Sequence, residues 1–208
     1  MRQLTGIFVL LGTLMTSPFS HAELPTPSSG FRALGQINLG QGPMVIHYYG
    51  KLRHLRLELP PLGRSVAGGT VLLLNYYPGA ESYVFPVGDG LAEDDQEFTP
   101  VTLADAQSLF PPLLFNPQGT ATRRTGTRFI AGEPCDLMQI GIVDSQPVNP
   151  PLQACITFDG AMLELQRDGL TIFRALEFHR ERLPEMLFMP PQNYQRDDNQ
   201  SQLDNYRS

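Results

Sequence analysis

Leucine alternates with polar residues in the segment that most clearly predicts a β-strand. Residues 54–59 read HLRLEL, so Leu55, Leu57 and Leu59 fall on one face and a histidine, an arginine and a glutamate fall on the other. A period of two residues is typical of a strand with one buried face. We therefore expect a strand whose leucine face packs inside the protein.

A hairpin is predicted further along the chain. The apolar runs 71–76 and 82–86 flank the sequence YPGAE, in which Pro78 and Gly79 favour a turn. Because several other apolar runs are short and end at glycine-containing turns, the sequence predicts a mainly β protein with a meander of antiparallel strands. The remaining strands are expected at residues 44–49, 129–130, 135–143, 152–158, 162–166 and 170–178.

Only two segments favour helix. Residues 102–110 begin with Thr102 as a potential N-cap, carry Asp105 three positions later and end before two prolines. This combination is typical of a short helix. Residues 184–188 are expected to form one further helical turn.

The N-terminus has the features of a secretory signal peptide. Arg2 supplies a positive charge, residues 7–15 form a short apolar run, and Ser20-His21-Ala22 places small residues where signal peptidase acts. We expect cleavage after Ala22. The apolar run is shorter than the roughly 20 residues that span a bilayer, which predicts an exported periplasmic protein without a transmembrane segment after cleavage.

The rest of the chain is expected to form one domain, because no repeat or change of composition divides it. The domain covers residues 31–191 and follows a linker at residues 23–30. Residues 192–208 are polar and almost free of apolar anchors, which predicts a disordered tail.

Composition excludes several functional classes. Hydrophobic residues make up 41% of the chain, which is enough for a packed core, so the chain as a whole is not disordered. There are 15 Lys and Arg residues against 21 Asp and Glu residues, which gives a formal net charge of -6. Nucleic acid is therefore not an expected partner.

Cys135 and Cys155 are the only cysteines in the chain. An exported protein meets an oxidising compartment, where two cysteines favour a disulfide over a metal site. The two cysteines lie on neighbouring predicted strands around the proline-rich sequence SQPVNPP. A register that places residue 137 opposite residue 153 brings them together for a cross-strand bridge. The alternative is two free thiols.

The sequence contains no recognisable catalytic or metal motif. Ser65 lies in a glycine-flanked loop with the wrong spacing for a nucleophile elbow, and there is no phosphate-binding loop, dinucleotide motif or H-E-x-x-H. Glu177 and His179 alone share a predicted strand face as potential metal ligands, whereas His47 and His54 are read as ordinary strand residues. We expect no catalytic residues, no metal and no cofactor.

Three arginines form the one basic patch, at Arg123, Arg124 and Arg128 in the sequence ATRRTGTR. Two interpretations stay open. The arginines either form an exposed polar strand face or contact an anionic head group.

Three short motifs in the second half resemble a bacterial family. They are the segment AGEPC ending at Cys135, the segment CITFDG beginning at Cys155, and the segment LFMPPQNY ending at Tyr194. Together they are similar to an uncharacterised exported family with the pattern G-x-x-C, C-x-T-x-D-G and L-F-x-x-P-x-x-Y. Its members resemble the lipoprotein-carrier superfamily typified by LolA and LolB.

The resemblance implies a strongly curved antiparallel sheet, an incomplete or half-barrel, with one or two short helices over an apolar concave face. Such a cavity buries acyl chains at about 0.8 kcal/mol per CH2 group. The expected lining residues are Leu55, Leu57, Leu59, Leu72 and Leu74, and core packing is the alternative for these positions.

Two functions follow as expectations. The first is a non-enzymatic periplasmic protein that binds a lipid, a lipoprotein or another apolar ligand. The second is an envelope module that contacts another protein, or acts as a sensor, without a small ligand.

Overall fold

The computed structural model describes residues 29–38, 42–60, 68–77, 79–89, 91–92, 96–102, 105, 121–143 and 146–198. The predicted signal peptide, the linker up to residue 28, Ser65 and most of the predicted helix at residues 102–110 lie outside the described residues.

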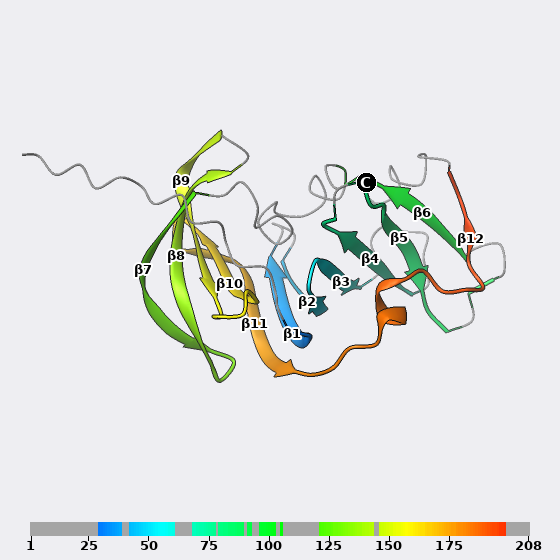
Figure 1. The fold of residues 1–208 in the computed structure, drawn as a ribbon, viewed down its shortest axis with the longest axis horizontal. Helices are drawn as coiled ribbons and strands as arrows, with labels where there is room; N and C mark the ends of the chain where they lie inside the picture. The colour runs from blue at the N-terminus through cyan, green and yellow to red at the C-terminus, as the bar shows by residue number, and fades with distance from the viewer. Residues whose placement is uncertain are drawn as a thin grey trace, which may run out of the picture.

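The described residues form one curved sheet of twelve strands (Figure 1), so the predicted mainly β fold with its half-barrel curvature is confirmed. The strand order across the sheet is β12-β6-β5-β4-β3-β2-β1-β11-β10-β9-β8-β7. In chain order the strands are β1 Phe31–Asn38, β2 Pro43–Lys51, β3 His54–Leu59, β4 Gly69–Asn75, β5 Ser82–Val87, β6 Glu97–Val101, β7 Ala121–Ile130, β8 Glu133–Val143, β9 Gln146–Ile156, β10 Met162–Arg167, β11 Leu170–Arg180 and β12 Gln195–Arg196.

The first and last long strands meet in the middle of the sheet. β1 pairs antiparallel with β2 on one side and with β11 on the other. The β1–β11 ladder therefore joins two antiparallel meanders, β1 to β6 and β7 to β11, into one sheet. β12 is the exception to the antiparallel pattern, because it pairs parallel with β6.

One large hydrophobic core lies on the inner face of the curved sheet. It combines the leucines of β3 with Phe31, Phe173 and Phe178 from the central strands and with apolar residues of β8, β9 and β10. Gly35 belongs to this packing, since a Cβ atom there would lie 2.5 Å from the ring of Phe173. The sequence predicted the leucine face of residues 54–59 to be buried, and the structure confirms it.

A smaller core lies on the opposite face of β4 and β5. It is formed by Val71, Leu73 and Phe85, and Tyr194 packs against it from the C-terminal segment. The Tyr194 ring meets Phe85 edge-on at 5.6 Å, and its hydroxyl donates to the carbonyl oxygen of Pro86. β4 is thus buried on both faces.

The C-terminal segment differs from the predicted tail. Residues 192–208 were expected to be disordered, but residues 192–198 are part of the fold because β12 pairs with β6 and Arg196 forms an ion pair with Glu81. The physical reason is Tyr194, an aromatic anchor in a stretch that composition alone makes polar. Residues 199–208 lie outside the described residues.

The helical turn predicted at residues 184–188 is confirmed as the 3-10 helix η3, Glu185–Phe188. Its Phe188 ring packs on His54 at 5.7 Å, and Arg56 donates to the carbonyl oxygen of Leu187. At the other predicted helix, Thr102 and Asp105 exchange the hydrogen bonds of a helix cap, in which the Asp105 amide donates to Thr102 Oγ1.

The proline-rich sequence SQPVNPP was expected to be a turn between two strands, and this prediction is wrong. β9 begins at Gln146, and Val143 pairs with Gln146 next to the turn. The ladder continues from the pair Ile142–Pro147 to the pair Ile140–Leu152, with a register shift between them. Residues 148–151 have no ladder partner on β8, so prolines there remove no ladder hydrogen bond on that side.

Candidate functional site

A disulfide joins β8 to β9, as predicted. Cys135 and Cys155 are bonded, with their Cα atoms 5.4 Å apart. The register differs by two residues from the expected one, because Leu137 lies opposite Cys155 and Gln139 lies opposite Gln153. The bridge is therefore diagonal. Both cysteines are buried in the main core, where the bond holds the outer strands in place.

The residues of the C-x-T-x-D-G motif form a hydrogen-bonded corner at the end of β9. Thr157 Oγ1 donates to Asp159, and Ser29 donates to the same carboxylate. Arg180, at the end of β11, donates twice to Asp159 at 2.9 and 3.2 Å and forms an ion pair with Glu133 of β8. Two of the three motif segments, AGEPC and CITFDG, are thus tied to one guanidinium group, and Ser29 before β1 joins them through Asp159.

The electrostatics of this corner indicate a structural role. Burial raises the pKa of Asp159, but the hydrogen bonds from Arg180, Ser29 and Thr157 outweigh it and hold this pKa far below its usual range. Asp159 in turn raises the pKa of Arg180. Both groups stay ionised at any physiological pH, so neither is suited to exchange protons with a substrate.

An open pocket of about 600 Å³ adjoins this corner. It is lined by Ser29, Gly30, Lys51, Arg180, Glu181, Arg182 and Leu183. Five of its seven lining residues have polar or charged side chains, although most of its lining surface is apolar. Two of its cations are already engaged, Lys51 by Glu185 and Arg180 by Asp159. The pocket is open to solvent and carries four charged side chains, so it is not an enclosed cavity for an acyl chain.

The five leucines expected to line a ligand cavity lie in the main core. Leu55, Leu57, Leu59, Leu72 and Leu74 are each at most 4% exposed and pack against one another and the central aromatic residues. The structure therefore favours the core-packing alternative for these positions. None of the five lines the pocket described above.

The three predicted arginines lie on β7, and each has a partner within the sheet. Arg123 donates to Gln139 at 2.7 Å, Arg124 forms an ion pair with Asp136 at 2.8 Å, and Arg128 forms one with Glu164 at 2.9 Å. They do not form one cluster, because Arg123 and Arg128 lie opposite Gln139 and Cys135 on one face of the sheet, whereas Arg124 lies on the other.

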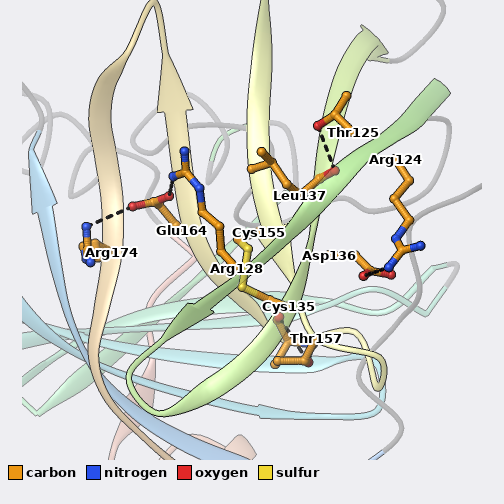
Figure 2. Close-up of a disulfide and its surroundings, with 11 residues drawn as sticks. Arg124, Thr125, Arg128, Cys135, Asp136, Leu137, Cys155, Thr157, Glu164 and Arg174 are labelled. Carbon is orange, nitrogen blue, oxygen red and sulfur yellow. Dashed lines mark hydrogen bonds and ion pairs between the residues drawn. A yellow bond between two sulfur atoms is a disulfide. The ribbon is translucent and has the colours of Figure 1, made fainter.

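The sequence did not single out Glu164, which organises the arginines near the disulfide. Its side chain is 2% exposed and accepts from Arg128 on one oxygen and from Arg174 on the other (Figure 2). Cys155, Glu164 and Arg174 are direct neighbours across β9, β10 and β11. A glutamate between two leucines looked like an ordinary polar strand position, since only the pairing of β10 with β11 reveals its second arginine.

β7 is the last strand of the sheet, and within the described part of the chain no strand pairs with its outer side. Residues 123–129 are exposed, apart from the half-buried Gly126. The turn to β8 has positive φ at Ala131 and Gly132, as in a two-residue hairpin, so Ile130 and Glu133 face each other through their backbone groups. Backbone groups then alternate along the strand. Those of Arg128 point toward β8, and those of Thr127 and Phe129 point outward.

Comparison with solved structures shows the fold. An uncharacterised conserved protein from Thermus thermophilus is similar at a TM-score of 0.51, with 13% identity over 83% of this chain and 91% of that chain. The Pseudomonas aeruginosa MucA/MucB complex is similar at 0.38, with 14% identity over 81% of this chain and 58% of that chain. A putative outer membrane lipoprotein-sorting protein domain from Vibrio parahaemolyticus is similar at 0.28, with 8% identity over 78% of this chain and 91% of that chain.

No protein-family model matches the chain, and no curated protein matches it by sequence. At these identities, the likeness to the Thermus protein shows a shared fold alone. The function must therefore be argued from the site itself.

The histidines and carboxylates of the described residues form no group of three that could hold a metal ion. His47 stacks on Tyr49 at 6.5 Å, and His179 lies on β11 opposite Arg32. Within the described ranges, no helix has the length and apolar character needed to cross a bilayer.

Proposed function

We propose that this protein is an exported, non-enzymatic module that binds another protein through the outer edge of β7. The outer edge of β7, with which no described strand pairs, is the observation that carries this proposal. A long edge strand with exposed backbone groups is a template for an added strand from a second chain. β7 has ten residues and no edge-blocking proline.

Binding of a lipid inside the sheet is the weaker of the two functions that the sequence suggested. A carrier needs an open apolar cavity, and the leucines that were to line it are packed as core residues. Phe31, Tyr48 and Phe173 pack edge-on in the same core, with Tyr48 in contact with both phenylalanine rings.

Export is supported by two features. The predicted signal peptide ends at Ala22, and the disulfide between Cys135 and Cys155 suits an oxidising compartment. We place the protein in the periplasm on these grounds.

Catalysis is not part of the proposal. Among the described carboxylates, only Asp159 has a strongly shifted pKa, and it is hydrogen-bonded to Arg180. His47 and His179 have no acidic partner among the contacts described above. Replacing His47, His179 or Ser65 by alanine is expected to leave the cellular function unchanged.

Photocrosslinking in the cells that make the protein tests the proposal. Benzoylphenylalanine replaces Phe129, which is 76% exposed on the edge strand, in the full-length protein. The matched control carries the same group at Leu170, which is 74% exposed at the turn between β10 and β11.

We expect one protein adduct from position 129 and none from position 170. Equal adducts from both positions, or no protein adduct from position 129, would contradict the proposal. An adduct whose added mass is that of a lipid would restore the lipid-binding function in its place.

A further inference from the structure

The charges on β7 differ from those of the protein as a whole. Ala121–Ile130 contains three arginines and no acidic residue, whereas the chain carries a formal net charge of -6. A second copy of the chain would place this arginine-rich strand against itself, and like charges across a strand pair are destabilising. A partner strand with carboxylates fits the edge, and a basic strand does not.

Arg128 is at a position of β7 where the Cα atom of an added antiparallel strand would come closest. Because its backbone groups point toward β8, it forms a non-hydrogen-bonded pair with the residue opposite it on an added antiparallel strand. In such pairs the Cα atoms are about 4.5 Å apart and the side chains are closer than in hydrogen-bonded pairs. The side chain opposite Arg128 therefore lies beside the Arg128 side chain.

The guanidinium groups of Arg128 and Arg174 have unused capacity. They are 45% and 53% exposed, and each makes one hydrogen bond to Glu164 through Nη1. A guanidinium group has five N–H donors. The three side chains together carry a charge of +1, because one buried carboxylate faces two cations. A carboxylate on an added strand beside Arg128 balances this charge.

Arg123 extends the same face of the strand. It lies opposite Gln139, two pairs beyond Leu137, on the face that carries Arg128. Thr125, at the bulge between them, donates from its hydroxyl to the carbonyl oxygen of Leu137 (Figure 2). The disulfide face of β7 thus presents one cation near each end. The other face presents Arg124 and the exposed ring of Phe129.

We infer that the partner contributes an extended acidic segment that adds to β7 as a further strand. One of its carboxylates lies opposite Arg128, and another lies near Arg123. This inference rests on the proposed function and specifies the chemistry of the partner.

Peptide binding to the mature protein tests the inference. The probe is a fluorescent, capped peptide that alternates valine and glutamate, so that its glutamates share one face of a strand. Two matched peptides serve as controls. One carries lysine in place of glutamate, and the other keeps glutamate but has alternate backbone amides methylated, which prevents strand pairing.

We expect the glutamate peptide alone to bind. Arg123→Glu should weaken binding of the glutamate peptide about tenfold or more and make the lysine peptide bind, because it reverses the charge at an exposed position. Arg128→Gln should weaken it by a similar factor. Arg182→Glu is the control, because it makes the same charge change at the pocket away from β7.

Equal binding of the methylated glutamate peptide would overturn strand addition. An equal effect of Arg182→Glu would show that the peptide is attracted by the overall charge of the protein and not by β7. No binding of the glutamate peptide overturns the inference. Circular dichroism of each variant checks that it is folded. If Arg128→Gln unfolds the protein, Arg123→Glu still tests the inference, because the hydrogen bond from Arg123 to Gln139 lies on the surface.

The two proposals fail in distinguishable ways. If position 129 crosslinks a protein but the arginine substitutions leave that adduct unchanged, the acidic segment is wrong and the proposed function stands. If position 129 yields no protein adduct, the proposed function itself fails.

Discussion

Arg180 holds Asp159 through two hydrogen bonds, although Asp159 lies in the turn between β9 and β10 and Arg180 is the last residue of β11. The Asp159 side chain is 4% exposed, and its other oxygen contacts come from Ser29 and Thr157. This pair connects the second meander to the start of β1. The spacing of C-x-T-x-D-G thereby has a structural explanation in this chain.

Replacing Asp159 by asparagine should lower the free energy of unfolding by about 2 to 3 kcal/mol, because the buried carboxylate loses its charge-assisted hydrogen bonds to Arg180. Urea unfolding at pH 7 measures the change. Asp136→Asn is the control, since its ion pair with Arg124 is exposed and should contribute less than about 1 kcal/mol. The pKa of Asp159 is lowered by folding, so its stabilisation should disappear as the pH falls below the ordinary value of 3.8. An unchanged midpoint for Asp159→Asn would contradict this account.

His54 should make stability depend on pH in the mildly acidic range. Burial between Tyr77 and Phe188 lowers its pKa from the ordinary value of 6.5, and the nearby Lys51 acts in the same direction against the opposing effect of Glu185. The unfolded chain then takes up a proton at higher pH than the folded one, so stability should fall as the pH falls below 6.5.

Urea midpoints at pH 7.5 and pH 5.5 measure this dependence. His54→Phe keeps an aromatic ring in place and should remove the histidine's contribution. If the variant loses as much stability as the parent between the two pH values, His54 is not the group responsible.

Removing the disulfide should cost about 3 kcal/mol in the chain-entropy model for a loop of this length. Its two cysteines are 20 positions apart. The double replacement Cys135→Ala and Cys155→Ala avoids a free thiol, and chemical unfolding measures the loss. In protein taken from the periplasm, the intact mass should correspond to a chain starting at Glu23 and be two hydrogens below the reduced form. Two thiol labels added without prior reduction would rule the bond out in cells.

Leu57→Gln distinguishes a core position from a cavity wall. Leu57 is 1% exposed, and a buried amide without partners should lower stability by several kcal/mol. Leu170→Gln, at an exposed site, should have little effect. Organic extraction and mass spectrometry of the parent protein should find no stoichiometric lipid. A stable Leu57→Gln variant, together with lipid bound to the parent and lost from the variant, would support a carrier.

Local patterns were sufficient to predict the strands whose two faces differ. The alternation at residues 54–59 is explicit because three leucines face the core and the polar residues between them hold the C-terminal segment. β1 has the same alternation, with Phe31, Ala33 and Ile37 buried. It was not predicted, because small residues, including the Gly35 that Phe173 requires, weaken its apolar signal.

Pairing between strands that are distant in the chain accounts for the parts of the fold and the site that sequence patterns did not predict. The pairing of β1 with β11 joins residues that are far apart in the chain, and no local pattern encodes it. Glu164 illustrates the consequence for the site, since its two arginines come from β7 and β11. The arginines of β7 were predicted as a patch, but their place on a free edge depends on the strand order.

Hydrogen exchange at the edge of β7 is the most direct test of the central claim. The measurement compares the backbone amides of the free mature protein with those of the protein purified in its crosslink-identified complex. Thr127 and Phe129 should exchange far more slowly in the complex, because their outward amides gain partners, whereas Arg128 and Gly126 should change little. Unchanged exchange at Thr127 and Phe129, with protection appearing instead around the pocket at Lys51 and Leu183, would show that the partner binds elsewhere.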